Sequence, residues 1–348
     1  MARQSGRSAT LSDVARLAGV STATASKALN ERAEVAPATR ERVLKAAEVL
    51  AFQPNVLARG LMSGRTGTIG LLTDELGGRF SIPILLGVEN TVGNEMMSVL
   101  LCDARGDAIR RRHYLRTLLA RSVDGLIVVG ESNDLRPSLV DEVAVPVVYA
   151  YGESDNPDDL SIISDDRHGA TLAAEHLLAQ GRQAIGHITG EPTYRAARER
   201  ASALGEVLER AGQPIVGGAM FGDWTQRWAR HAARTLLAAH PGLDAIFCGS
   251  DQLAVGVTDT LNQMGVRIPD DVALVGYDNW EAFSAQSNPP LTTIDTNLQD
   301  IGAAAAKHLF DALGGEATSG VIRHPTRLVV RESTGPRTTG RATSGPTV

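Results

Sequence analysis

The sequence predicts an α/β fold in which a small helical unit precedes two successive lobes built on parallel sheets. Three observations support this prediction. Apolar residues in the N-terminal segment recur at helical spacing. From Thr68 onward, short apolar strands alternate with amphipathic helical stretches, which is typical of parallel sheets covered on both faces. This alternation occurs in two series, and a 348-residue chain is long for a single domain.

Two short helices are predicted at the start of the chain. Thr10 has the hydroxyl of an N-cap, and Asp13 follows at capping-box spacing. Gly19 suits the left-handed residue that ends a helix, and Ser21 is expected to cap a second helix over residues 22–29. This arrangement is a helix-turn-helix, whose second helix can enter the major groove of DNA.

A third helix is predicted to begin at Pro37, a residue suited to the first helical position. Its apolar face is expected to consist of Val43, Leu44, Ala47 and Leu50, with Phe52 closing the small core. Pro54 then ends the helix, and the glycines at 60, 64 and 67 make the following segment marginal as an isolated helix.

The charge is divided unevenly along the chain. Residues 1–65 contain ten Lys and Arg against five Asp and Glu, whereas the remaining 283 residues contain 24 basic and 35 acidic side chains. A basic end on an acidic body is suited to phosphate binding by one part of the molecule. A solvated helical cap with a chance charge difference is the plainer alternative.

The run from Thr10 to Gly64 resembles the DNA-binding headpiece and hinge of the LacI/GalR family of bacterial transcription regulators. The resemblance implies a headpiece over 1–52 and a hinge helix or linker over 53–66, in which Leu61 wedges into the minor groove of an operator bound by two copies. The DNA-contacting positions that it implies are Ser21, Thr22, Ala23, Thr24, Lys27, Asn30, Thr39, Asn55, Ala58 and Leu61. Thr22 and Lys27 can hydrogen-bond base edges, whereas Ala23 offers only a methyl group.

Strands are expected in two series: Thr68–Thr73, Ser98–Asp103, Gly125–Val129, Pro146–Ala150 and Ser161–Ser164, then Ala184–Thr189, Gly218–Phe221, Ala245–Gly249 and Val272–Tyr277. Polar residues cluster where these strands end, and parallel sheets bind ligands beyond the carboxyl ends of their strands. We therefore expect a ligand cleft between two doubly wound lobes.

The family resemblance extends to about Glu332, most specifically in Gly276-Tyr277-Asp278 and the run from Pro289 to Ile294. It implies a two-lobed, periplasmic-binding-protein-like core for effector binding and dimerisation over 67–332. Lobe 1 is expected at about 67–165 and 295–322, lobe 2 at about 166–294 and 323–332, and a disordered tail, rich in Gly, Ser, Thr and Pro, at 333–348.

Seven side chains are implied as effector-binding by position: Asp74, Phe80, Tyr151, Arg200, Trp224, Ser250 and Asp278. The fork of Arg200 suits hydroxyls or a carboxylate, and Asp278 suits hydroxyl or amine donors. The alternatives are a helix-surface role for Arg200, an N-cap for Asp278 and ordinary packing for Trp224. Arg79 replaces the proline of the family's Asn-Pro-Phe-Phe segment, and this departure, with Tyr151 and Ser250, weakens assignment to a particular sugar. The basic run at 110–112 is interpreted as a solvated face.

No apolar run approaches the roughly 18 residues that cross a bilayer, and residues 1–7 lack an apolar core, so we expect a cytoplasmic protein without membrane contact. Cys102 and Cys248 are expected to be buried free thiols, and no metal or cofactor is predicted.

The leading hypothesis is a homodimeric repressor of a palindromic double-stranded DNA operator, controlled by a small molecule, most simply a sugar or sugar derivative. One alternative is the same regulator switched by a protein partner. A cleft enzyme is the other alternative, although the sequence has none of GxxxxGK[ST], GxSxG or HExxH.

Overall fold

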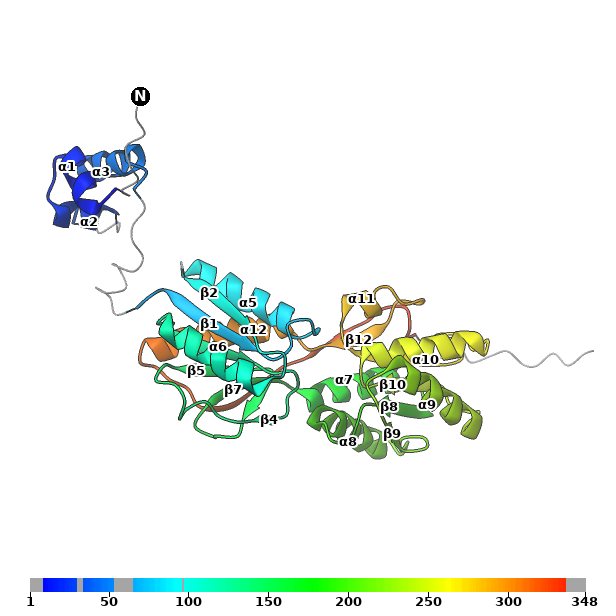
Figure 1. Cartoon of the computed structure of the whole chain (residues 1–348). Coiled ribbons are helices and arrows are strands. Elements are labelled where there is room, and N and C mark those ends of the chain that lie inside the picture. Colours follow the sequence, from blue (N-terminus) through cyan, green and yellow to red (C-terminus); the bar gives the residue numbers. More distant parts are fainter. Residues whose placement is uncertain (1–8, 30–33, 53–64, 96, 336–348) are drawn as a thin grey trace, which may run out of the picture. The chain divides into compact units, whose positions relative to one another are not determined.

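The computed structural model describes residues 9–29, 34–52, 65–95 and 97–335, and Figure 1 shows its elements along the chain. The chain divides into two compact units, Met1–Gly67 and Thr68–Val348. Four predicted DNA-contacting residues, Asn30, Asn55, Ala58 and Leu61, lie outside the described residues, as does most of the predicted hinge.

The first unit contains three helices in its described part, α1 (Leu11–Ala18), α2 (Thr22–Leu29) and α3 (Pro37–Val49). The capping box is confirmed, because the Thr10 hydroxyl accepts the Asp13 N–H at 3.3 Å and Asp13 accepts the Thr10 N–H at 3.0 Å. Gly19 adopts the left-handed conformation with φ 66°, and Ser21 accepts the Thr24 N–H at 3.1 Å. These local contacts fix the turn between α1 and α2.

The three helices share one small core. Its buried residues are Val14, Ala15, Ala18, Ala25, Ala28, Val35, Val43, Ala46 and Ala47, with Leu50 and Phe52 packed against them. The prediction for Leu44 is wrong, since its side chain is 50% exposed. Positions 43, 46, 47 and 50 already form a face at helical spacing, and position 44 is rotated about 100° from position 43, toward solvent.

The second unit begins with lobe 1, a six-stranded parallel sheet in the order β13-β7-β5-β3-β1-β2. Its strands are β1 (Thr68–Thr73), β2 (Ser98–Asp103), β3 (Gly125–Val129), β5 (Val147–Ala150), β7 (Leu160–Ser164) and β13 (Gly320–His324). A two-stranded ribbon joins β4 (Leu135–Arg136) to β6 (Glu153–Ser154).

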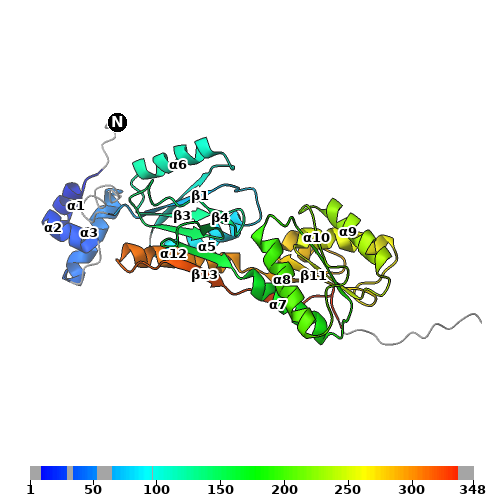
Figure 2. The same ribbon diagram turned by 90° about the horizontal axis from the view of Figure 1, so that it is seen from below.

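Helices cover both faces of the lobe 1 sheet. α5 (Ser81–Asn94) and α12 (Leu298–Leu313) lie side by side on one face, as Figures 1 and 2 show. α6 (Ala108–Ala120) packs Leu115 and Leu118 against the other face. The two layers bury β1, β3, β5 and β7, so polar side chains are placed at the strand ends.

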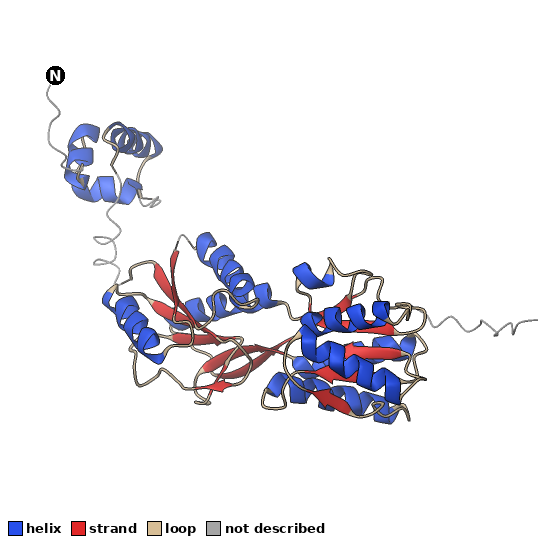
Figure 3. Ribbon diagram, turned by 45° about the vertical axis from the view of Figure 1, so that its right-hand side comes forward, coloured by secondary structure: helices blue, strands red, loops and turns tan. Residues whose placement is uncertain are grey.

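Lobe 2 is a second six-stranded sheet in the order β14-β12-β11-β10-β8-β9, parallel except for β14. Its strands are β8 (Ile185–Thr189), β9 (Ala219–Phe221), β10 (Ala245–Cys248), β11 (Ala273–Asp278), β12 (Thr292–Asp295) and β14 (Arg327–Val329). α7 (Asp166–Ala179) and α8 (Arg195–Arg210) cover one face, while α9 (Gln226–Ala239) and α10 (Asp251–Gln263) cover the other. The short α11 is Glu281–Ser284. Figure 3 shows both sheets in red between blue helices.

The chain crosses between the lobes after β7, after β12 and after β13. The crossing segments are hydrogen-bonded to one another: Asn297 donates to the Pro325 carbonyl at 2.9 Å, and the Asp165 N–H donates to the His324 carbonyl at 3.0 Å. These three linked segments, the inter-lobe crossings, connect lobe 1 to lobe 2.

The predicted tail boundary at Ser333 is too early. Ser333 is buried, and its hydroxyl donates to the Leu274 carbonyl at 2.6 Å and accepts the Thr292 N–H at 2.8 Å. The Gly335 carbonyl accepts a hydrogen bond from Arg182 at 3.0 Å. Leu274 and Thr292 belong to the interior strands β11 and β12, so these bonds anchor the segment to the lobe 2 sheet and the packed chain extends through Gly335.

Two further sequence predictions concern the thiols and the membrane. Cys248 is a buried free thiol, as predicted, whereas Cys102 is only half-buried because it lies on the edge strand β2. Across the described ranges, every helix is too short or too polar to span a bilayer.

Candidate functional site

The N-terminal end of α2 presents small and polar side chains to the solvent. Ser21, Thr22 and Ala23 are exposed, whereas Ala25 and Ala28 face the core. This division follows from the helical period, because positions 25 and 28 lie on one face. The predicted base-reading positions are therefore accessible, with hydroxyls able to reach phosphates or base edges.

Lys27 lies further along α2 and forms an ion pair with Glu34. Both side chains are more than half exposed, and such surface pairs contribute little to stability. The pair therefore holds Lys27 only weakly, and Lys27 remains available to a stronger acceptor. Thr39, on α3, is half-buried.

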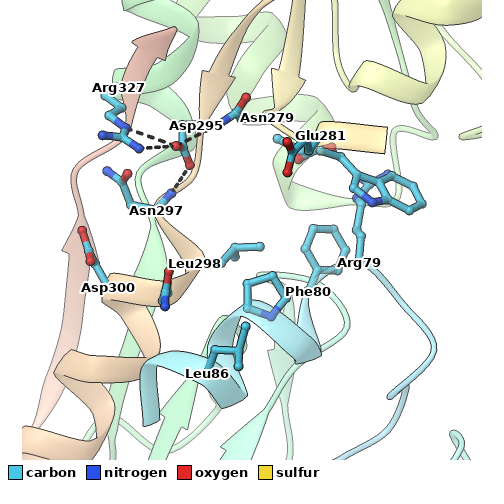
Figure 4. A pocket seen from close by; sticks show the side chains of 14 residues that line it. Arg79, Phe80, Leu86, Asn279, Glu281, Asp295, Asn297, Leu298, Asp300 and Arg327 are labelled. Atoms are coloured by element: carbon cyan, nitrogen blue, oxygen red, sulfur yellow. Dashed lines mark hydrogen bonds and ion pairs between the residues drawn. The ribbon is translucent and has the colours of Figure 1, made fainter. Parts of the chain in front are cut away.

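A pocket of about 440 Å³ lies between the two lobes, beside the inter-lobe crossings. Lobe 1 contributes Arg79 and Phe80 just before α5 and Leu86 within it. Lobe 2 contributes Asp278 at the end of β11 and the three residues that follow it. Figure 4 shows this pocket, with Asp295 hydrogen-bonded to Arg327, Asn279 and Asn297 near the inter-lobe crossings. Its volume is in the range of small-molecule sites.

Asp278 ends β11 at the wall of this pocket. Its side chain is 2% exposed, and an Arg79 Nη2 lies 3.0 Å from its Oδ2. Neither carboxylate oxygen accepts a hydrogen bond within the described part of the chain. Burial raises the pKa of Asp278, while Arg79 and Arg200 act in the opposite direction. A buried acceptor with unused hydrogen-bonding capacity is suited to a ligand donor.

Phe80 and Tyr151 form an aromatic pair in the cleft. Their ring centroids are 4.4 Å apart at an interplanar angle of 28°. Tyr151 is buried, and burial raises the pKa of its phenol well above the usual value. The phenol is thus a neutral donor where the family pattern has a carboxylate.

Arg200 is buried on α8, in the polar layer beneath the cleft. Its Nε donates to Asp166 at 2.7 Å, its Nη1 donates to the Gly249 carbonyl, and its Cζ lies 3.6 Å from the Tyr277 ring centroid. Burial opposes its charge, but Asp166 and the neighbouring groups outweigh that effect and raise the pKa of Arg200. Arg200 is thus engaged by partners within the protein, and its contact with a ligand stays a prediction.

Trp224 is the aromatic neighbour of this arginine. Its ring centroid lies 6.0 Å from the Arg200 Cζ and 6.0 Å from the Tyr194 ring. The indole packs directly over Gly190, where any side chain would overlap it. The absence of a side chain at Gly190 therefore allows the Trp224 ring to pack against the backbone at the end of β8.

Ser250 and Asp251 lie at the start of α10. The Ser250 hydroxyl accepts the Leu253 N–H at 3.3 Å and caps the helix. Asp251 accepts the Thr293 hydroxyl at 2.6 Å and the Trp280 N–H at 2.7 Å. Burial, followed by repulsion from Asp278, raises the pKa of Asp251 to about 8. Asp251 thus supports the loop that carries Asp278.

Of the seven predicted effector residues, only Phe80 and Asp278 line the 440 Å³ pocket, and Asp74 lies elsewhere. It lines a second pocket, of about 630 Å³, at the end of β1. Arg111 and Arg136 pair with it at 2.9 and 3.0 Å. The basic run at 110–112 is therefore more than a solvated face, because Arg111 neutralises a nearly buried carboxylate.

Sequence reasoning missed the contacts that tie the lobes together. Arg195 of lobe 2 pairs with Glu153 of lobe 1 at 2.7 Å, and its N–H donates to Asp134 at 2.8 Å. Asn133 donates to Asp166 across the same boundary. These residues carry no local motif. Arg79 could have been found from the sequence, because it stands where the family pattern has a proline.

The backbone is strained at three cleft residues. Tyr151, Asp278 and Asn279 have φ angles of 64°, 100° and 52°, a region that side-chain-bearing residues rarely adopt. Such outliers persist only where the surroundings enforce them and are frequent at functional sites.

A helix-turn-helix unit followed by a two-lobed core with a pocket between its lobes is the architecture of a class of DNA-binding transcription regulators. The model for bacterial regulatory proteins of the lacI family matches residues 10–55, and that for the periplasmic binding protein-like domain matches residues 174–334. The chain is 33% identical over 310 residues to the HTH-type transcriptional repressor PurR of Aliivibrio salmonicida, covering 88% of this chain and 92% of that protein. It is 34% identical over 327 residues to the ribose operon repressor of Halalkalibacterium halodurans, covering 93% and 97%.

Among solved structures, the fold is similar to the Lac repressor dimer bound to operator and the anti-inducer ONPF, with a TM-score of 0.76 and 28% identity, covering 94% of this chain and all of that one. The chain therefore belongs to the lacI family of bacterial regulatory proteins. It is a DNA-binding transcriptional repressor of that family, and its relatives above are repressors rather than enzymes.

Proposed function

We propose that this repressor binds a palindromic operator as a homodimer and that a small molecule in the inter-lobe cleft controls its operator affinity. The observation that carries the effector half of the proposal is Asp278, a buried carboxylate without hydrogen bonds at the wall of a 440 Å³ pocket. We further propose that it acts in the cytoplasm, because its target is operator DNA.

The proposed DNA contacts form two groups. The first lies in the described part of the headpiece and consists of Ser21, Thr22, Ala23, Thr24, Lys27 and Thr39. The second lies outside the described residues and consists of Asn30, Asn55, Ala58 and Leu61. The exposed N-terminal end of α2 supports Ser21, Thr22 and Ala23 in the first group. The headpiece is assigned to 1–52 and the hinge to 53–66. Dimer symmetry then matches operator symmetry, as in the operator-bound Lac repressor dimer to which the chain is similar.

On the cleft side, the proposed ligand contacts are Phe80, Tyr151, Trp224 and Asp278. Arg200 holds Asp166 and the Trp224 face in place, Ser250 caps α10, and Asp74 supports lobe 1. Aromatic faces beside hydrogen-bonding groups suit a sugar or sugar derivative. The chain's similarity to a ribose operon repressor supports the same class.

Control of DNA binding requires that the ligand bind two states of the lobes unequally. The ion pair between Arg79 and Asp278 and the Arg195–Glu153 pair connect lobe 1 to lobe 2. A ligand that changes these connections changes the relation of the lobes, and hence the spacing of two headpieces in a dimer.

The test begins with selection of operator sequences from random duplex DNA by the full chain. We expect enrichment of a palindrome. A panel of monosaccharides, disaccharides and nucleosides is then screened by thermal shift, and each stabilising compound is added to the operator complex. Enrichment of no palindrome contradicts the DNA half. A stabilising compound that leaves operator affinity unchanged contradicts the effector half.

A further inference from the structure

Arg79 inserts its side chain from lobe 1 into the ligand cleft. The guanidinium lies 3.0 Å from Asp278 of lobe 2, and its Cζ lies 4.6 Å from the Phe80 ring centroid and 5.8 Å from that of Trp280. A carboxylate and two aromatic faces around one cation form the kind of site that binds ammonium and guanidinium groups. The protein thus displays a filled cation site.

The fit between Arg79 and this site is incomplete. The Arg79 Nε is buried without a hydrogen-bond partner, and both Asp278 oxygens are in the same condition. A buried donor and acceptor that remain unsatisfied cost free energy. A ligand able to donate directly to Asp278 therefore has an interaction to gain that Arg79 leaves unused.

The charge of the surrounding pocket favours a cation. Its wall carries the carboxylates of Asp278, Glu281, Asp295 and Asp300 against two guanidinium groups. Arg327 is directed to Asp295, to which it donates at 2.8 and 3.1 Å. Glu281 and Asp300 form no ion pair within the described chain. The pocket is consequently net negative, which disfavours an anionic ligand.

We propose that Asp278, Phe80 and Trp280 form a cation subsite that Arg79 occupies in the absence of ligand, and that the effector carries an ammonium or guanidinium group, as an amino sugar does, that displaces Arg79. This inference rests on the proposed function, because it assumes that the cleft binds the effector. Arg79 is then the residue that sets ligand specificity, since a neutral sugar gains nothing from the carboxylate while Arg79 remains in place.

Displacement also sets the apparent affinity. While Arg79 occupies the subsite, only the fraction of molecules with a vacant subsite can bind a ligand, so the apparent Kd is raised by the inverse of that fraction. If the subsite is vacant in about one molecule in a hundred, removal of Arg79 lowers the apparent Kd of a cation by about a hundredfold.

The experiment uses the full chain with Arg79→Ala and the probe ethylguanidinium, which reproduces the atoms that this substitution removes. Ethylurea is the neutral probe of nearly the same shape. Binding is measured by isothermal titration at constant ionic strength. We expect ethylguanidinium to bind Arg79→Ala at least about tenfold more tightly than it binds the wild type, and at least about tenfold more tightly than ethylurea binds the same variant.

Two controls make the result specific. Asp278→Asn, introduced beside Arg79→Ala, is expected to remove the preference for ethylguanidinium. Arg105→Ala removes an exposed lobe 1 arginine that lines the second pocket and not the 440 Å³ pocket, and this variant is expected to behave as the wild type. Arg79→Gln replaces Arg79→Ala if the latter does not melt cooperatively. Equal binding of the two probes, or a preference that survives Asp278→Asn, overturns the proposal. Operator binding is measured separately, so failure of the proposed function is recognised by the absence of a preferred palindrome.

Discussion

Replacement of Arg200 by alanine is expected to destabilise lobe 2 severely. The guanidinium and its partner Asp166 are each 2% exposed, and the pair is joined at 2.7 Å. Removal of one member leaves a buried, uncompensated carboxylate, which costs about 3–5 kcal/mol. At roughly 2–4 °C per kcal/mol for a domain of this size, the melting temperature should fall by about 6–20 °C.

Circular dichroism melts at neutral pH measure this change, with Arg198→Ala as the matched control. Arg198 lies on the same helix but is exposed, so we expect its loss to change stability by about 0.5 kcal/mol or less. Combining Arg200→Met with Asp166→Asn should recover most of the loss, because the buried charge is removed along with its partner. If Arg200→Ala has the same melting temperature as Arg198→Ala, the Arg200 guanidinium does not stabilise lobe 2.

Three other predictions concern pH, salt and the hinge. Burial raises the pKa of Asp251 to about 8 in the folded protein, so the stability it contributes is complete below its unfolded pKa, near 3.8, and is lost as pH rises toward 8. The free energy of unfolding of Asp251→Asn should therefore increase relative to that of the wild type as pH rises across this range. A difference between the two proteins that stays constant with pH in denaturant titrations contradicts the shift. Raising salt from about 50 to about 200 mM should reduce operator affinity by roughly 10³ if about six phosphates are neutralised, and a flat fluorescence-anisotropy profile excludes phosphate-dominated binding. Leu61→Ala should weaken operator binding and leave the core's melting temperature unchanged; unaltered operator affinity removes Leu61 from the minor groove.

Local chemistry made much of the fold predictable from sequence. The capping box at Thr10 and the glycine at position 19 act over a few residues, and the structure confirms both. Strands β1, β2 and β3 match their predicted bounds. For the buried β1 and β3, this follows because a sheet covered on both faces imposes continuous apolar runs between turn residues.

The site was less predictable, because its contacts join residues far apart in the chain. The pairing of Arg79 with Asp278 depends on how the lobes meet, and the same is true of Arg195 with Glu153. Position in the sequence predicts Arg200 as a ligand contact, whereas its ion pair with Asp166 could be seen only in the fold. Composition predicts Ser333 as part of the tail, although hydrogen bonds to β11 and β12 hold it in place.

Coupling between the cleft and the headpiece is tested most directly by measuring the affinity of a cleft ligand twice, once for the free repressor and once for the repressor saturated with its selected operator. The ligand is the compound that gives the largest thermal shift. The two dissociation constants should differ by at least about fivefold, and their ratio should equal the factor by which the ligand changes operator affinity, because linkage is reciprocal. Equal ligand affinity in the two states contradicts control of the operator from the cleft.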